Sequence, residues 1–271
     1  MADDPSPEVE NQRNEARQRR SQRLEEIADQ FKQSIAYSKA REAAAKGEVA
    51  SFKADPRMEA MLPYARGEKP VIFQANHRAE ILDALFLAKA LKLKAIIGGG
   101  QEAWKVAPEL KEAGVPVLIS GVLQLPGESH DPYDAPYTNA AKLQAAGVKF
   151  AIQSGGGGPD EATAARNLPF EAGTAAAFGL SEADALKSIT LAPAEILGMA
   201  DQLGSIKAGK KANLVVSRGS ILQATTPVVL LVIDGRVMKP ESRHTRLADK
   251  YRERLRQVRA GMVPLGVKGN K

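Results

Sequence analysis

The 271-residue chain contains no cysteine, which excludes disulfide frameworks and thiolate metal sites. It has no apolar run near the roughly 20 residues of a membrane-spanning helix, and its first residues lack the apolar stretch of a secretory signal. Aromatic residues make up only 5% of the sequence, so alanine, leucine and valine must form the core. The sequence predicts no membrane partner, and it does not specify a compartment.

Motifs of several well-known site types are also missing. Neither glycine run, 98–100 or 155–158, fits GxxxxGK[ST] or GxGxxG, so neither is a nucleotide-binding fingerprint. The three histidines, His77, His130 and His244, are isolated from one another, and no HxH pair occurs. A metal centre built on paired histidines of one strand is therefore not encoded.

Positive charge is in excess but unevenly placed. The net charge is +6, while residues 236–271 alone hold eleven Lys or Arg against three Asp or Glu. Such a tail is typical either of a nucleic-acid or membrane-surface patch or of a solvated terminal helix, here over residues 247–259. Because no aromatic interleaving and no nucleic-acid module accompany the charge, we predict the helix and no nucleic-acid partner.

Residues 1–60 contain no strand pattern and are predicted to form a helical N-terminal segment, disordered over its first ten residues. From residue 9 to residue 50 the sequence is rich in strong helix formers with charges of both signs. One thin apolar stripe at three- and four-residue spacing should pack on a neighbouring element. Its members are Leu24, Ile27, Phe31 and Ile35. Two prolines, Pro56 and Pro63, then end the pattern.

From residue 69 the pattern becomes strand, loop, helix, repeated. Short apolar strands are predicted at 70–75, 94–99, 115–120 and 147–153. Helices are predicted between and after them at 78–91, 103–113, 138–146, 162–178 and 182–189, the last with a capping box of Ser181 and Asp184. Strands that alternate with helices require a parallel sheet. Four such β/α units amount to half of an eight-fold barrel.

The stretch from Leu191 to Met238 is the most informative part of the chain. It predicts a short helix that begins near Pro193 and ends near Gly198, followed by a turn rich in glycine and lysine. Three strands are predicted next, at 213–217, 227–233 and 236–239, and the last two form a hairpin closed on Asp234-Gly235. Helix, turn and hairpin therefore follow one another within fewer than fifty residues.

This stretch, with LGSIKAGKKANLVV at 203–216 and VVLLVIDGRVM at 228–238, resembles the C-terminal end of the amidohydrolase superfamily, and within it the imidazolonepropionase-like members. The resemblance covers about 70–240 and implies the fifth to eighth units of a (β/α)8 barrel. The implied fold is α/β: the C-terminal half of a TIM-type barrel, a small C-terminal β-sandwich and an N-terminal helical segment. The implied domains are the helical segment at 1–60, the half-barrel at 61–200, the sandwich strands at 201–240 and a basic helix and tail at 241–271.

The resemblance also implies where a divalent metal ion would bind. Members of the superfamily take its ligands from the ends of barrel strands, where the ion lowers the pKa of a bound water molecule. Three of these positions can be placed here, and they hold Gln74, Gly98 and either Ser154 or Gly155. None offers an imidazole or a carboxylate, so we assign no metal ligand and no cofactor to this chain.

Three residues are candidates for catalysis. His77 follows the first of the four predicted strands, at 70–75. It could be a displaced metal ligand or a general acid. The alternative is a loop histidine that hydrogen-bonds to the helix after it. His130 and Asp131 lie in the long loop after the third strand, 125–137, and could serve acid–base or metal chemistry. The prolines of that loop favour a rigid lid as the alternative.

Ligand-binding candidates lie at the same strand ends. The glycine runs could direct backbone N–H groups at a carboxylate or phosphate, or could simply provide turns that need a positive φ. Trp104, the only tryptophan, could wall a pocket or contribute to packing. The predicted set is Gln74, Gly98, Gly99, Gly100, Trp104, Ser154 and Gly155.

By resemblance the function is hydrolysis of a non-peptide carbon–nitrogen bond in a cyclic or linear amide, with the usual metal ligands missing. The alternative is a non-catalytic subunit that binds a ligand or assembles on a degenerate half-barrel. An open half-barrel exposes unpaired strand edges, which must be covered. We therefore expect an amide-type small molecule as substrate or ligand, and either a homo-oligomer or a partner that supplies the missing half of the barrel.

Overall fold

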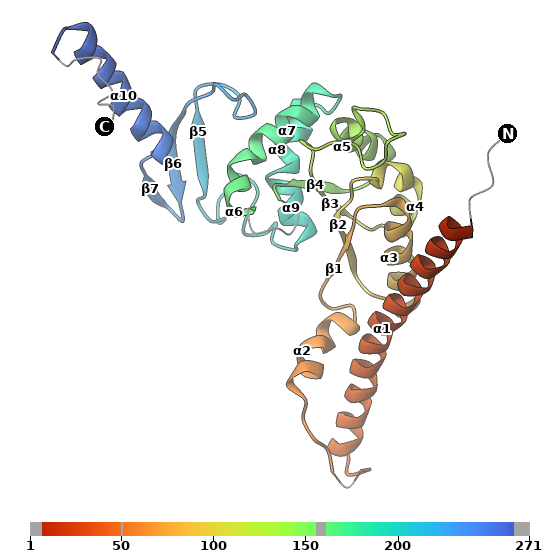
Figure 1. Ribbon diagram of the computed structural model, residues 1–271. Coiled ribbons are helices and arrows are strands. Elements are labelled where there is room, and N and C mark those ends of the chain that lie inside the picture. Colours follow the sequence, from red (N-terminus) through yellow and green to blue (C-terminus); the bar gives the residue numbers. More distant parts are fainter. Residues whose placement is uncertain (1–6, 50, 156–160, 263–271) are drawn as a thin grey trace, which may run out of the picture. The chain divides into compact units, whose positions relative to one another are not determined.

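The computed structural model describes residues 7–49, 51–155 and 161–262, and it divides the chain into two compact units, residues 1–205 and 206–271. Figure 1 shows the helices and strands of both units. No helix among the described residues is long and apolar enough to cross a membrane.

The first unit begins with two helices, α1 (Pro7–Ala45) and α2 (Pro56–Ala65). Helix α1 begins two residues before the predicted start, inside the segment predicted to be disordered; residues 1–6 lie outside the described residues. The predicted apolar stripe does pack: Phe31 is buried, and α1 contacts both α2 and the first helix of the barrel portion. The Ser34 hydroxyl donates to the Met58 carbonyl of α2 at 3.3 Å.

A parallel sheet of four strands forms the centre of the first unit, in the order β1-β2-β3-β4 (Figure 1). The strands are β1 (Val71–Ala75), β2 (Ala95–Gly99), β3 (Val117–Ser120) and β4 (Phe150–Gln153). Each falls inside one of the four predicted apolar segments. The observed α/β fold with a four-stranded parallel sheet fits the predicted partial TIM-type barrel.

Helices alternate with these strands, as predicted. They are α3 (Arg78–Leu91), η1 (Ala103–Val106), α4 (Ala107–Ala113), α5 (Ala135–Ala146), α6 (Glu161–Ala164), η2 (Ala165–Asn167), α7 (Leu168–Ala177), α8 (Glu182–Ser188) and α9 (Leu191–Ile196). Two predicted single helices, 103–113 and 162–178, are each divided into shorter pieces. In both, a proline stands in the first turn of the later helix, Pro108 in α4 and Pro169 in α7. Proline has no N–H to continue the preceding ladder, so a new helix begins there.

The core lies on both faces of the inner strands. All residues of β2 and β3 are buried, and Ile97 and Ile119 are at most 1% exposed. On the face that carries Ile96, Leu118 and Ala151, helix α9 packs with Ala192 and Ile196. Strand β1, at the edge, is less covered, and its Ile72 is 46% exposed.

The predicted capping box at the start of α8 is only half formed. The Ser181 hydroxyl accepts a hydrogen bond from the Asp184 N–H at 3.1 Å, as expected of an N-cap. The Asp184 carboxylate accepts from the same hydroxyl at 2.7 Å. Because that carboxylate is engaged by the side chain of Ser181, the structure shows a simple N-cap in place of the reciprocal box.

The second unit contains an antiparallel sheet in the order β5-β6-β7, with β5 (Leu214–Ser217), β6 (Val228–Ile233) and β7 (Arg236–Met238). Asp234 and Gly235 close the hairpin with φ of 49° and 79°, the two positive values of a type I′ turn. Helix α10 (Arg243–Arg259) follows, four residues longer at its start than predicted, and a capping box of Ser242 and Thr245 begins it. The described strands of this unit form a single three-stranded sheet, so the predicted β-sandwich is only loosely supported.

Candidate functional site

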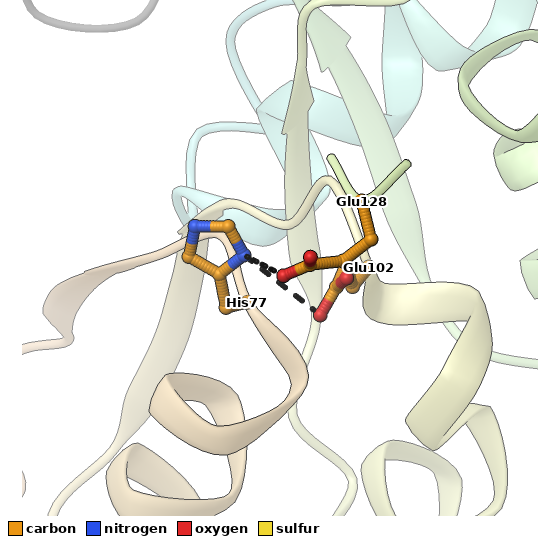
Figure 2. Close-up of side chains that lie close together, drawn as sticks. All are labelled: His77, Glu102 and Glu128. Atoms are coloured by element: carbon orange, nitrogen blue, oxygen red, sulfur yellow. Dashed lines mark ion pairs between the residues drawn. The ribbon is translucent and has the colours of Figure 1, made fainter. Parts of the chain in front are cut away.

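Polar side chains gather at the carboxyl ends of β1, β2 and β3. His77 is the N-cap residue of α3 directly after β1, Glu102 stands before η1 after β2, and Glu128 lies in the loop after β3. Parallel strands end at the same edge of their sheet, so the three side chains meet there. Figure 2 shows the His77 ring facing both carboxylates.

The geometry of this cluster is open and mixed in charge. The Nδ1 atom of His77 lies 3.9 Å from an oxygen of Glu102 and 3.9 Å from an oxygen of Glu128. One donor atom from each residue falls within 4.8 Å of the others. The side chain of Glu102 is only 6% exposed, whereas those of His77 and Glu128 are each 47% exposed. The cluster therefore combines one fixed, buried carboxylate with two groups that solvent can reach.

Two donors hold Glu102 in place. The backbone N–H of Arg78 donates to Oε2 at 2.6 Å, and the Lys105 ammonium donates to Oε1 at 2.7 Å. Burial alone would raise the pKa of Glu102, but these hydrogen bonds outweigh burial and hold that pKa below its ordinary value. Glu102 is therefore a carboxylate at neutral pH.

Lys105 joins this site to the loop after β3. Its ammonium contacts the Asp131 carboxylate at 2.7 Å as well as Glu102, and the Asp131 side chain is only 4% exposed. Burial alone would lower the pKa of Lys105, but the hydrogen bonds that its ammonium donates to both carboxylates raise it by more, so the net shift of this pKa is upward. The pair of carboxylates and the ammonium thus fasten the loop to η1.

His130 and Asp131, the two catalytic candidates of the loop after β3, do not hydrogen-bond to each other. His130 Nε2 lies 4.0 Å from Asp131 Oδ1, beyond hydrogen-bonding distance, and its side chain is 77% exposed. Asp131 is instead engaged with Lys105. Sequence alone could not reveal that pairing, because the two residues lie 26 positions apart and on different elements.

Gln74 and the first glycine run occupy the same part of the sheet. Gln74 pairs in register with Gly98, and a Cβ atom at Gly98 would lie 2.9 Å from the Gln74 side-chain oxygen. Gly99 and Gly100 have φ of +95° and +61°, and the Gly100 N–H donates to the Ala75 carbonyl at 2.9 Å. The run therefore serves a tight turn and a close approach, and the Gly100 N–H is not available to an anion.

The other ligand-binding candidates are dispersed. Ser154 is half-buried after β4, and Gly155 has a φ of +90°; the rest of that glycine run, 156–158, lies outside the described residues. The Trp104 ring lies under the Lys142 ammonium, 4.1 Å from the ring centroid, with Lys105 at 5.4 Å. These are cation–π contacts, and they place Trp104 against two lysines.

Several polar groups escaped the sequence analysis. Glu102 was one, although a carboxylate directly after a strand-ending glycine run is a recognisable position. Glu171 of α7 is another: it is 7% exposed, its Oε2 accepts the Val122 N–H at 3.0 Å, and burial raises the pKa of its carboxyl. Asn139 donates to the Gly100 carbonyl at 2.9 Å, while its buried Oδ1 has no hydrogen-bond partner among the described residues. Only the packing of distant segments reveals these roles.

Comparisons with known proteins support one family. The family model described as the amidohydrolase family matches residues 134–238. The crystal structure of an amidohydrolase from Thermotoga maritima MSB8 is 29% identical, with a TM-score of 0.69 over 79% of this chain and 55% of that chain. A second amidohydrolase structure is 25% identical, with a TM-score of 0.51 over 68% of this chain and 48% of that chain.

No curated protein matches the sequence of this chain. The chain spans about half the length of the two solved structures it resembles. None of these matches specifies the imidazolonepropionase-like subtype. The matched segment includes the helix, turn and hairpin that carried the resemblance, and the half-barrel aligns with two amidohydrolase structures. These matches support a member of the amidohydrolase superfamily, with residues 134–238 matching the family model directly.

Proposed function

We propose that this chain forms part of the catalytic site of a hydrolase that acts on a non-peptide carbon–nitrogen bond. The observation that carries the proposal is the cluster of His77, Glu102 and Glu128 at the carboxyl ends of three neighbouring parallel strands. Enzymes with (β/α) barrels place their catalytic groups at this end of the sheet. Similarity to the amidohydrolase superfamily supports the reaction class.

The residues at the positions implied by the family resemblance do not fit a divalent metal ion. Gln74, Gly98 and Gly155 offer no imidazole and no carboxylate. The cluster of His77, Glu102 and Glu128 does fit, because it presents one nitrogen and two carboxylate oxygens within 4.8 Å. Three protein ligands with an open position are what catalytic zinc sites use. A bound divalent ion would act there as a Lewis acid and lower the pKa of a water molecule.

The surrounding side chains have separate roles in this proposal. Lys105 and the Arg78 N–H fix the orientation of Glu102, so its carboxylate needs no rearrangement on binding. The exposed Glu128 can close toward the histidine from its loop. The Gln74 amide, exposed on the same edge of the sheet, supplies a donor and an acceptor that suit the amide group of a substrate.

A second candidate is a non-catalytic subunit that binds a ligand or assembles with another protein. It is favoured by Gln74, Gly98 and Gly155, which stand at the usual ligand positions and offer no imidazole and no carboxylate. On this hypothesis His77 caps α3, and the Lys105 ion pairs only fasten the loop after β3.

Metal binding separates the two candidates. We would dialyse the purified chain against Zn²⁺ or Mn²⁺ and measure bound metal for the wild type, His77→Ala and His130→Ala. His130 is the control, because it is a strongly exposed histidine on the neighbouring loop and outside the cluster. The catalytic proposal expects one ion per chain for the wild type and His130→Ala, and at least about tenfold weaker binding for His77→Ala.

A wild-type chain that binds no ion would reject the proposed metal-assisted site and favour the non-catalytic subunit. Where metal does bind, a panel of cyclic and linear amides tests the reaction. Metal-dependent hydrolysis that is lost in His77→Ala and kept in His130→Ala would establish the reaction class.

A further inference from the structure

The carboxyl of Glu171 lies in the interior of the first unit and holds a turn that leads toward the candidate site. Its Oε2 atom accepts the Val122 N–H at 3.0 Å, and the carboxyl also accepts a hydrogen bond from the Leu123 N–H. Both donors lie shortly after the end of β3. Glu171 therefore joins α7 to the first residues of the loop that carries Glu128.

The turn that Glu171 holds is tightly built. Gly121 has a φ of +79°, and a Cβ atom there would collide with the Gln124 side chain. That side chain accepts a hydrogen bond from Gln101 at 2.5 Å. Val122 itself is fully buried. Because so little space is left, the turn determines the direction in which the loop leaves the sheet.

The loop is fastened a second time at its far end, where Asp131 pairs with Lys105. Among the described residues, no hydrogen bond joins the span between these two anchors, 125–130, to another element. Glu128 lies in this span, and its carboxylate approaches the His77 ring to 3.9 Å. The two ends of the span therefore set where Glu128 stands.

Holding the turn in this way costs the fold free energy. Burial raises the pKa of the Glu171 carboxyl, the two backbone N–H groups lower it by less, and no charged side chain of the described residues offsets the burial. A raised pKa means that the folded state binds the neutral carboxyl better than the carboxylate. Glu102 is the opposite case, because the Lys105 ammonium stabilises its charge.

We propose that Glu171 is a positioning residue of the candidate site: its carboxylate fixes the turn after β3 and so places Glu128 opposite His77. It acts through two backbone N–H groups and touches neither the metal position nor a substrate. A carboxylate accepts hydrogen bonds on both oxygens, whereas a glutamine amide has one oxygen and an NH2 group that cannot accept. The charge of Glu171 thus serves the geometry of the site and lowers the stability of the fold. This inference rests on the proposed function, because it assigns Glu171 to the same metal site.

The test compares Glu171→Gln with Glu195→Gln in the full chain. Glu195 is the matched control, because it is a partly buried glutamate on α9 that pairs with Lys149 at the amino end of β4, away from the candidate site. Equilibrium dialysis against Zn²⁺ measures the affinity of both variants and of the wild type. We expect at least about tenfold weaker binding for Glu171→Gln, the usual effect of removing a group that orients a metal ligand, and an unchanged affinity for Glu195→Gln.

Two measurements on the metal-free chain separate positioning from a structural role. Urea unfolding at about pH 8, well above the ordinary pKa of a carboxyl, should give Glu171→Gln a midpoint equal to or above that of the wild type, because the variant buries no charge. Hydrogen exchange at the amides of Val122 and Leu123 should be at least about tenfold faster in the variant, because the turn is held less firmly. Replacing a residue with a purely structural role would instead lower the midpoint.

Three results would overturn the proposal. The first is equal Zn²⁺ affinity, or equal exchange at the turn, in the wild type and Glu171→Gln; the proposed function would then stand, but Glu171 would have no part in the site. The second is a clear loss of stability in Glu171→Gln, because Glu171 would then serve the fold. The third is a wild-type chain that binds no ion, which would reject the proposed function together with this role.

Discussion

The two sheets of this protein are built from similarly apolar strands but are covered to very different extents. Every residue of β2 and β3 is buried, whereas no residue of β5, β6 or β7 is. The sequences AIIGG and VLIS of the first sheet are no more apolar than LVVS and VVLLVI of the second. Strand hydrophobicity therefore does not decide burial in this chain.

What decides burial is the connection between strands. Parallel strands need crossover connections, and the helices in those connections cover the sheet they join. An antiparallel hairpin brings no helix with it. In the second sheet Val215 and Ile233 share one face and are 54% and 50% exposed, while Val237 on the other face is 71% exposed. Both faces of the second sheet therefore carry exposed apolar side chains.

The largest expected effect tests the buried sheet. Ile97→Ala removes a fully buried side chain from β2 and should lower the free energy of unfolding by about 2–5 kcal/mol. Urea unfolding followed by circular dichroism measures the change. Val215→Ala in β5 is the control and should cost less than about 1 kcal/mol, because its side chain is already half exposed. Equal costs at the two positions would contradict the comparison.

The second effect concerns polar groups, which among the described residues are buried only in the first unit. Lys105→Met leaves the carboxylates of Glu102 and Asp131 without their ammonium partner and should cost about 2–4 kcal/mol in urea unfolding. Lys142→Met is the control, because Lys142 also lies over the Trp104 ring but is exposed. A loss of similar size from both substitutions would mean that the cation–π contact, rather than the ion pairs, stabilises the loop.

Much of the fold was predictable from the sequence because its signals are local. Apolar strands alternate with helical segments, and each of the four observed strands falls inside a predicted one. The wrong predictions, of helix continuity and of a capping box, occurred where a single residue changes the local hydrogen bonds. Pro108 and Pro169 divide helices that periodicity alone joins, and the Ser181 hydroxyl engages the carboxylate that a capping box would use.

The candidate site was predictable only in part. His77 follows a strand in the sequence and does lie at the sheet edge, so its position was accessible from local pattern. The role of Glu102 depends on Lys105, only three residues later, and on the Arg78 N–H, which lies 24 positions away and has no signal in the sequence. Asp131 is adjacent to His130 in the sequence, but its buried carboxylate forms an ion pair with Lys105.

The third prediction uses pH to examine the same ion pairs. The pKa of Glu102 lies below its ordinary value of 4.5, so its charged form stabilises the folded state. That contribution is fully present above the unfolded-state pKa and is lost as pH falls through the folded-state pKa. Lys105→Met removes the donor, so its stability should fall less steeply than that of the wild type below about pH 4.5.

Urea midpoints at a series of pH values would measure the two slopes. The second unit supplies the contrast, because Arg256 lowers the pKa of Glu253 to about 2 although that pair lies exposed on α10. High salt should therefore screen the Glu253 pair and affect the buried Glu102 pair less. If the urea midpoints of the wild type and Lys105→Met fell equally steeply at acid pH, Lys105 would not set the pKa of Glu102.

The smallest expected effect comes from one substitution made in both sheets. Val237→Thr in β7 keeps the branched shape and adds a hydroxyl that water can reach, so the free energy of unfolding should change by less than about 0.5 kcal/mol. Val117→Thr in β3 makes the same change where the side chain is fully buried, and should cost about 1–3 kcal/mol. Urea unfolding of both variants measures the two losses in free energy of unfolding, which can then be compared. If Val237→Thr also proved costly, the Val237 side chain would be covered in solution, and the contrast between the two sheets would fail.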